Sequence, residues 1–279
     1  MKVRFKTVIL FILTLMLFIG GILVLSNNPH HNSYKLVTIY SNNMDEVSEI
    51  INKHPNSVNS VPSIMPRWWN VLVENRNFFP LQEACYKGNV DMVNRLLEAG
   101  VDVNAVDPYI GSTPLLMALS SGAASESRFD IAFLLIEHGA DINAVTRNRP
   151  GDSVISKSVI IRDSDSKIIK QRGYQLFDYL FANCQLTNIN WVSILMDSAY
   201  FSNINAVNKL INSGILDINS TNSLGQTALI NATLGKSKTM ISFLLEKGAD
   251  KGIKDDEGKR AYDHAIESGD TEIVKLLKD

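Results

Sequence analysis

The chain has 279 residues, of which 45% are hydrophobic and 20% are charged, and its formal net charge is −2. This composition supports a sizeable core and excludes wholesale disorder. Binding to nucleic-acid phosphates needs a basic surface, so the slightly acidic balance argues against a nucleic-acid partner. The two cysteines, Cys85 and Cys184, cannot form the framework of a disulfide-rich domain.

The N-terminus is the first segment with a distinctive composition. Residues 1–6 carry three positive charges, and residues 7–25 then continue for 19 residues without a charge. A helix of this length reaches roughly 28 Å at ~1.5 Å per residue, which is close to the thickness of a bilayer core. We therefore expect a transmembrane or signal helix at 7–25, with residues 1–6 in the cytosol and residues 26–33 as a linker.

Two fates of this apolar segment remain open. It is longer than the ~7–15 residues of a typical signal core, which favours an uncleaved membrane anchor. Val24-Leu25-Ser26 nevertheless offers a cleavage site for a signal peptide. For a bacterial source, the first alternative predicts a single-pass inner-membrane protein whose remaining chain lies in the periplasm. The second predicts a free periplasmic protein.

The rest of the sequence contains an internal repeat. Residues 88–104 read GNVDMVNRLLEAGVDVN, and residues 202–219 read SNINAVNKLINSGILDIN. In both copies the apolar residues recur at the i, i+3, i+4 spacing of an amphipathic helix, and Gly100 is the expected left-handed residue after the first one. A shorter helix is expected before it, from Pro80 to about Lys87, because proline is favoured in a first helical turn.

The same frame returns further along the chain. GSTPL at 111–115 opens a unit that closes with FLLIEHGADIN at 133–143, and GQTAL at 225–229 opens one that closes with FLLEKGAD at 243–250. These motifs resemble the ankyrin repeat, whose signature is G-x-T-P-L-H-x-A followed by a second helix ending L-L-x-x-G-A-D-x-N.

The resemblance covers residues 34–279 and implies an all-α ankyrin-repeat solenoid of helix-turn-helix units with hairpin fingers. The seven expected units lie near 34–59, 77–107, 108–146, 147–190, 191–221, 222–254 and 255–279, with an inserted loop at 60–76.

Several positions depart from the signature. The unit at 147–190 contains an insertion at 159–173, and Asn183 replaces the glycine after its second helix, where asparagine would tolerate the left-handed conformation. The signature histidine is missing from every unit, and Gln82 occupies its place in the unit at 77–107. In the family this histidine links neighbouring repeats, so its absence predicts lower local stability with the same fold.

The sequence shows no convergent catalytic or metal-binding motif. HExxH, CxxC, GxSxG and P-loop patterns are absent from it. His264 follows Asp263, but no Ser or Cys nucleophile shares its helix, so we expect a surface pair. Cys85 and Cys184 lie two units apart, roughly 20 Å for helices stacked at ~8–10 Å, which is too far for a disulfide. We expect buried thiols and a non-enzymatic protein without cofactor or metal.

A surface for binding another protein remains. The family resemblance implies a concave face formed by the inner helices and by fingers at 105–112, 144–153, 220–226 and 252–259. Aromatic residues dominate interface hot spots, and adjacent tryptophans in the loop at 60–76 cannot both point inward if that loop is extended. The candidate partner-binding residues are Arg67, Trp68, Trp69, Tyr109, Ile110, Arg147, Arg149, Tyr200, Phe201 and Leu224. Asp107, Asp255 and Glu257 are further finger-tip residues.

The layout resembles that of exported bacterial ankyrin proteins, which include immunity proteins that neutralise secreted toxins such as lipase effectors. By this resemblance the chain would bind a toxin in the periplasm or at the outer face of the inner membrane. Other possibilities are an accessory or scaffold protein for an envelope or redox enzyme, and a eukaryotic or viral membrane-tethered adaptor. A hydrolase would need a nucleophile such as Ser153 or Ser156 beside a histidine, and none is near in sequence.

Overall fold

The computed structural model describes residues 80–107, 111–120, 127–147, 152–161, 165–185, 187 and 189–278. The predictions for the apolar segment at 7–25, the linker at 26–33, the unit at 34–59 and the loop at 60–76 lie outside these residues. Within the described ranges, no helix combines the length and the apolar character needed to cross a bilayer.

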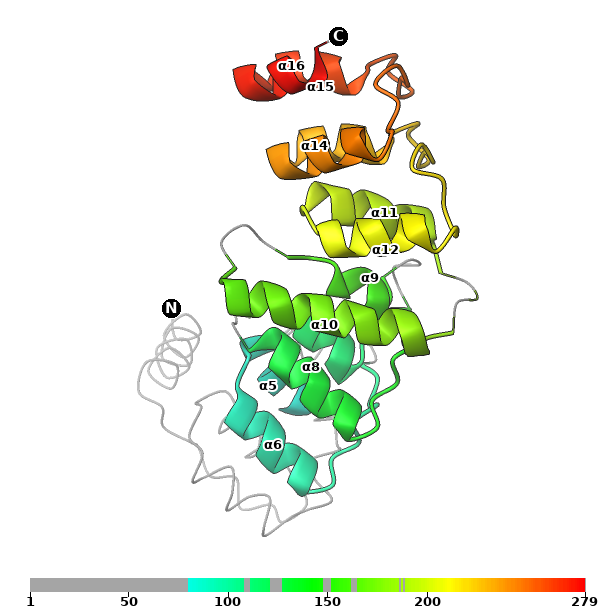
Figure 1. The fold of residues 1–279 in the computed structure, drawn as a ribbon. Coiled ribbons are helices and arrows are strands. Elements are labelled where there is room, and N and C mark those ends of the chain that lie inside the picture. The colour runs from blue at the N-terminus through cyan, green and yellow to red at the C-terminus, as the bar shows by residue number, and fades with distance from the viewer. Residues whose placement is uncertain are drawn as a thin grey trace, which may run out of the picture. The chain divides into compact units, whose positions relative to one another are not determined.

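The described chain consists of consecutive helix pairs, which follow one another in chain order in Figure 1. The first helices of the pairs, called inner helices here, are α5 (Pro80–Lys87), α7 (Pro114–Ser120), α9 (Val154–Ser158), α11 (Trp191–Tyr200), α13 (Ala228–Leu234) and α15 (Ala261–Ser268). The second, or outer, helices are α6 (Val90–Glu98), α8 (Arg128–Glu137), α10 (Lys167–Asn183), α12 (Ile204–Asn212), α14 (Lys238–Glu246) and α16 (Thr271–Leu277).

Each pair buries apolar side chains against its neighbours. Leu81 and Ala84 on α5 are buried, as are Val93, Leu96 and Leu97 on α6. Burial of one leucine side chain stabilises the fold by roughly 1.5–3 kcal/mol. Every inner helix in the described chain packs against the next inner helix as well as against its own outer helix. The predicted all-helical ankyrin-repeat solenoid is thus confirmed.

The outer helices begin and end at residues with clear local roles. The side-chain oxygen of Asn89 accepts the Met92 N–H at 3.0 Å and so caps the start of α6. Gly100 follows α6 with a φ of 76°, which confirms the predicted left-handed residue. The equivalent prediction for Asn183 is wrong. Asn183 is the last residue of α10, and Cys184 after it is extended, with a φ of −76° and a ψ of 155°.

Asp-x-Asn sequences link neighbouring units. Asn104 shows the arrangement: Asp102 accepts its backbone N–H at 2.9 Å, and its own Oδ1 accepts the backbone N–H of Asp141 in the next unit at 2.7 Å. Asn143 and Asn219 form equivalent links, at 2.7 Å to the Gln185 N–H and 2.9 Å to the Asp250 N–H. These bonds fix the position of one outer-helix end relative to the next.

Gln82 forms a buried hydrogen bond from the position of the missing signature histidine. Its Nε2 donates to the carbonyl of Ala105 at 2.7 Å, at the start of the next finger, and the side chain is completely buried. An amide therefore takes the place of the imidazole as a buried donor in this unit, and the lower local stability stays a prediction.

The insertion in the fourth expected unit, at 147–190, is partly helical. Its residues 167–173 form the first turns of α10, so they lengthen the outer helix. Gly173 lies against the Phe129 ring, where an added Cβ would come within 2.8 Å of the ring. Arg128 of α8 donates to Asp165 at 2.5 Å and to the Ile160 carbonyl at 3.1 Å, and both ionic side chains are nearly inaccessible to solvent. The insertion is thus held by a buried ion pair.

Candidate partner-binding face

Three finger hairpins share one backbone pattern. The N–H of the first hairpin residue donates to a carbonyl four or five residues later: Asp107 to Ser112 at 2.9 Å, Asn222 to Gln226 at 3.0 Å and Asp255 to Lys259 at 2.9 Å. Oδ1 of Asn222 also accepts the backbone N–H groups of Leu224 and Gln226, both at 2.9 Å. An Asn or Asp side chain at this position therefore stabilises the turn from inside.

Two residues predicted at the finger tips do not face solvent. Asp107 is 1% exposed and Asp255 is 7% exposed. Asp255 accepts backbone N–H groups of Glu257 and Lys259 through Oδ1 and pairs with Nε2 of His264 through Oδ2 at 2.7 Å. Although burial raises the pKa of the Asp255 carboxyl, the hydrogen bonds from His264 and the backbone lower it overall. Both residues hold the hairpins and are unavailable to a partner.

The histidine–aspartate pair is also different from the one that adjacency in sequence suggested. His264 pairs with Asp255 of the finger, whereas Asp263 pairs with Arg260, its Oδ2 accepting the Arg260 backbone N–H at 2.9 Å. The imidazole thus joins α15 to its finger. This contact explains the histidine structurally without a catalytic role.

Successive fingers contact each other through their backbones. The Arg147 N–H donates to the Gly111 carbonyl at 3.4 Å, and the Asp256 N–H donates to the Leu224 carbonyl at 3.0 Å. Among the predicted contact residues, Arg147 is exposed and Leu224 is 57% exposed. The predicted finger residues Tyr109, Ile110 and Arg149 lie outside the described residues, as do Arg67, Trp68 and Trp69 of the inserted loop.

The C-terminal end of α11 presents aromatic side chains. Tyr200 is 45% exposed, and its ring packs edge-to-face on Phe201, with centroids 5.1 Å apart. Phe201 is half-buried. Both predicted residues therefore have accessible surface on an inner helix. Tyr86, on the inner helix α5, is half-buried and packs against the core.

Leu234 is an accessible residue that sequence reasoning missed. It is 39% exposed and occupies in α13 the position of Tyr200 in α11, two residues after the small core residues Ala232 and Ser198. The two helix ends touch, because an added Cβ at Gly235 would collide with the Tyr200 carbonyl. Comparing the units position by position would have found Leu234.

Tyr200 and Leu234 form one row on the inner helices. A second row consists of the polar side chains that immediately precede the small core residues, such as Ser198 and Ala232, in α9, α11, α13 and α15. The row contains Lys157, Asp197, Asn231 and His264. Lys157 pairs with Asp152 at 2.9 Å, Asn231 donates to the Thr227 carbonyl at 3.1 Å, and His264 pairs with Asp255. Asp197 alone in this row forms neither an ion pair nor a side-chain hydrogen bond with the residues that the structure describes.

These two rows and the exposed parts of the fingers form what we call the inner face. Its components belong together because Gln82 and His264 join inner helices to fingers by direct hydrogen bonds. Apolar rings, aliphatic tips and a few charges alternate on it. Such a mixture is typical of protein–protein contact surfaces.

The array of helix pairs with hairpin fingers matches a known family in sequence as well. A family model described as "Ankyrin repeats (3 copies)" matches residues 36–146 and 195–279. The chain belongs to the ankyrin repeat family. The matched ranges leave out 147–194, where the insertion and the departures from the signature lie. Ankyrin repeats mediate protein–protein interactions and are generally scaffolds without enzymatic activity.

Individual ankyrin proteins resemble the chain over most of its length. The ankyrin repeat protein YahD of Escherichia coli (strain K12) is 28% identical over 201 residues, covering 70% of this chain and 92% of YahD. The crystal structure of the human ASB11 ankyrin repeat domain aligns with a TM-score of 0.59 at 23% identity, covering 86% of this chain and 94% of that domain. The latter similarity concerns the fold.

Some relatives are much longer than the chain. A protein named NAD-dependent deacetylase sir2B, from Dictyostelium discoideum, is 24% identical over 236 residues, covering 79% of this chain. The match covers 26% of sir2B itself, so the similarity concerns a portion of that protein.

The two cysteines of this ankyrin protein are unsuited to nucleophilic chemistry. Both are buried free thiols, as predicted. Burial raises the pKa of the Cys85 thiol and, although a backbone hydrogen bond opposes it, that of Cys184. In the described ranges, no group of three or more His, Cys, Asp or Glu side chains is arranged to hold a metal ion.

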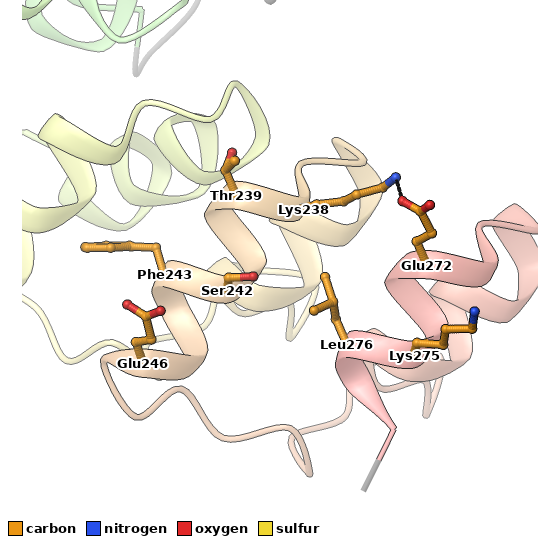
Figure 2. A pocket seen from close by; sticks show the side chains of 8 residues that line it. All are labelled: Lys238, Thr239, Ser242, Phe243, Glu246, Glu272, Lys275 and Leu276. Carbon is orange, nitrogen blue, oxygen red and sulfur yellow. Dashed lines mark hydrogen bonds and ion pairs between the residues drawn. The ribbon is translucent and has the colours of Figure 1, made fainter.

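A shallow groove of about 610 Å³ lies between the outer helices α14 and α16 (Figure 2). Lys238 pairs with Glu272 at its edge, and Phe243 and Leu276 contribute apolar surface. Its lining includes two lysines and two glutamates, so it favours neither sign of charge. The groove belongs to the outer helices and is separate from the predicted inner-face residues.

Proposed function

We propose that this ankyrin repeat protein binds another protein through its inner face and performs no chemistry of its own. The observation that carries the proposal is the pair of exposed apolar side chains, Tyr200 and Leu234, at equivalent positions of adjacent inner helices. Large apolar side chains on neighbouring elements are typical of a surface covered by a partner. Leu224 on the finger of α13 extends the same kind of surface.

The experiment compares two tyrosines of similar exposure on different helix layers. Tyr200 on the inner helix α11 is 45% exposed, and Tyr179 on the outer helix α10 is 41% exposed. A photo-crosslinking amino acid is placed at either position in the full-length protein, and adducts formed in cells are identified by mass spectrometry. We expect one defined partner at position 200 and none at 179.

A binding measurement then tests the purified partner against variants. Tyr200→Glu should weaken the complex at least tenfold, whereas Tyr179→Glu should leave it intact, with folding of both variants confirmed by circular dichroism. Equal cross-linking from both positions, or equal loss from both variants, would contradict the inner-face proposal.

The finer proposal is that the partner is a secreted toxin, such as a lipase effector, which the protein neutralises as an immunity protein in the periplasm or at the outer face of the inner membrane. Support comes from the charged and apolar pattern of residues 1–25, which predicts export, and from the ankyrin array itself. This proposal concerns where the protein lies and which partner it binds. It is independent of the proposal that the inner face makes the contact.

Co-expression tests the immunity role. Cells that export a candidate effector to the periplasm should survive when the full-length chain is present. They should die when residues 1–25 are removed so that the array stays in the cytosol. Survival with the truncated chain would contradict the periplasmic site, and death in both cases would contradict protection from that effector.

A further inference from the structure

The polar row of the inner face contains one accessible carboxylate, Asp197. In the described residues Asp197 has no hydrogen-bonding or ionic partner, although its neighbours Lys157 and Asn231 in the row both have one. The Asp197 side chain is half-buried rather than fully solvated. Gln82 Oε1 is the one buried side-chain oxygen without a partner in the described residues, so the Asp197 oxygens are accessible to solvent and to a partner.

Asp152 and Lys157 are the charged groups of the described chain that act on Asp197. The Lys157 ammonium is 2.9 Å from Asp152, so one cation serves two carboxylates at this point of the face. Burial raises the pKa of Asp197, the Asp152 charge raises it further, and the Lys157 charge opposes this in part. A cationic side chain of a partner would therefore interact favourably with the Asp197 carboxylate.

An apolar surface lies directly beside this carboxylate. Tyr200 follows Asp197 by three residues on α11, a spacing that places both side chains on the same side of a helix. Leu234 occupies the neighbouring helix at the position of Tyr200, and the backbone of α13 touches that of α11 there. One negative group and two exposed apolar groups are therefore contiguous.

From this juxtaposition we infer that the partner presents an Arg or Lys side chain to Asp197 and an apolar side chain beside it to Tyr200 and Leu234. The inference deepens the proposed function and rests on it. The occupant is a segment of another protein, because a free small cation would leave the apolar surface uncovered. An arginine would suit the site well, since its planar group pairs with a carboxylate and stacks on an aromatic ring.

The test uses the purified full-length protein in detergent and a phage library of random peptides as the probe. Peptides selected on the wild type should be enriched in Arg or Lys next to Leu, Phe, Tyr or Trp. Their affinity, measured by fluorescence anisotropy, should fall about tenfold or more for Asp197→Asn, because a charge-assisted bond is lost. Glu246→Gln, which neutralises an exposed carboxylate on the outer helix α14, is the matched control and should change nothing.

A second substitution in the peptide completes the test. Replacing its basic residue by citrulline or glutamine should weaken binding to the wild type as Asp197→Asn does and cause no further loss in that variant. Thermal unfolding of each variant shows that the loss does not come from unfolding.

The outcomes separate the two proposals. The inference would be overturned if peptides that lose binding with Tyr200→Glu lacked basic residues. It would also be overturned if those peptides bound Asp197→Asn as tightly as the wild type. Either outcome would leave the proposal of inner-face binding intact. Peptides insensitive to both Asp197→Asn and Tyr200→Glu would contradict both proposals.

Discussion

Asn104 Oδ1 accepts the backbone N–H of Asp141 across the boundary between two units at 2.7 Å, while Asn104 Nδ2 donates to the Gly139 carbonyl at 3.0 Å. One side chain thus satisfies two backbone groups of the next unit. This geometry explains why an asparagine closes the Gly-Ala-Asp-x-Asn motif: only an amide offers a donor and an acceptor at that reach.

Asn104→Ala should therefore destabilise the protein by about 0.5–1.5 kcal/mol, because the exposed bonds to the Asp141 N–H and the Gly139 carbonyl would be replaced by bonds to water. Urea unfolding followed by circular dichroism measures the change. Asn94→Ala, on the outer helix α6, is the matched control and should be close to neutral. Equal destabilisation by both variants would show that the inter-unit bonds are unimportant.

Lys236→Gly should stabilise the protein. Lys236 has a φ of 56° at the turn after α13, where the units of α5 and α15 have Gly88 and Gly269 with φ of 71° and 72°. A left-handed residue other than glycine costs about 1 kcal/mol. Lys236 is exposed and its removal opens no cavity. An increase in unfolding midpoint, measured by differential scanning calorimetry, is the expected result.

Ser202→Gly provides the contrasting case for this turn. Ser202 is also left-handed, with a φ of 61°, but its hydroxyl lies 2.6 Å from that of Ser237. Removing the hydroxyl should cancel much of the backbone gain. If Ser202→Gly stabilised the protein as much as Lys236→Gly does, the hydroxyl contact would contribute nothing.

Arg128→Met should cost about 3–5 kcal/mol, because the buried Asp165 carboxylate would lose its ion pair with Arg128. The double variant Arg128→Met/Asp165→Leu should regain much of this loss, since no charge is then left in the interior. Chemical unfolding of the two single variants and the double variant measures the coupling. Additive losses would mean that the two side chains do not act as a pair.

Asp197→Asn should stabilise the free protein at neutral pH. Burial and the Asp152 charge raise the pKa of Asp197 in the folded state, so the folded protein binds this proton more tightly than the unfolded chain does. The charged carboxylate therefore costs stability above its unfolded pKa of about 3.9, and the cost disappears as the group protonates at lower pH. The gain in unfolding midpoint should be present at pH 7 and absent at pH 3. A gain that is unchanged at pH 3 would contradict this explanation.

Local sequence patterns were sufficient for much of the fold. Pro80 begins α5 and Lys87 ends it as predicted, because proline suits a first helical turn and the left-handed Gly88 follows. Gly100 follows the end of α6 as predicted, for the same local reason. Such residues act through their own backbone conformations. Their effect can therefore be predicted from the residue type and the adjacent sequence.

Long-range contacts account for what the sequence could not show. Asp107 and Asp255 have the polar character of loop residues, but they are buried inside the hairpins. Gln82 reaches a carbonyl 23 residues away, and nothing in the local sequence indicates that acceptor. Asn183 stays helical in an outer helix that the insertion has lengthened. On the inner face, Tyr200 was found because it is aromatic, whereas Leu234 required comparison with it.

The shortness of α9 has a consequence for how the protein would come apart. A repeat array transmits order only from each unit to the next, so its cooperativity is limited by the smallest interface along the row. α9 contributes only five residues to the ladder of inner helices, while the long α10 packs mainly on α8 and α9. Pulled from its ends, the molecule should rupture first between α9 and α11, and the C-terminal helix pairs from α11 onward should detach as one block.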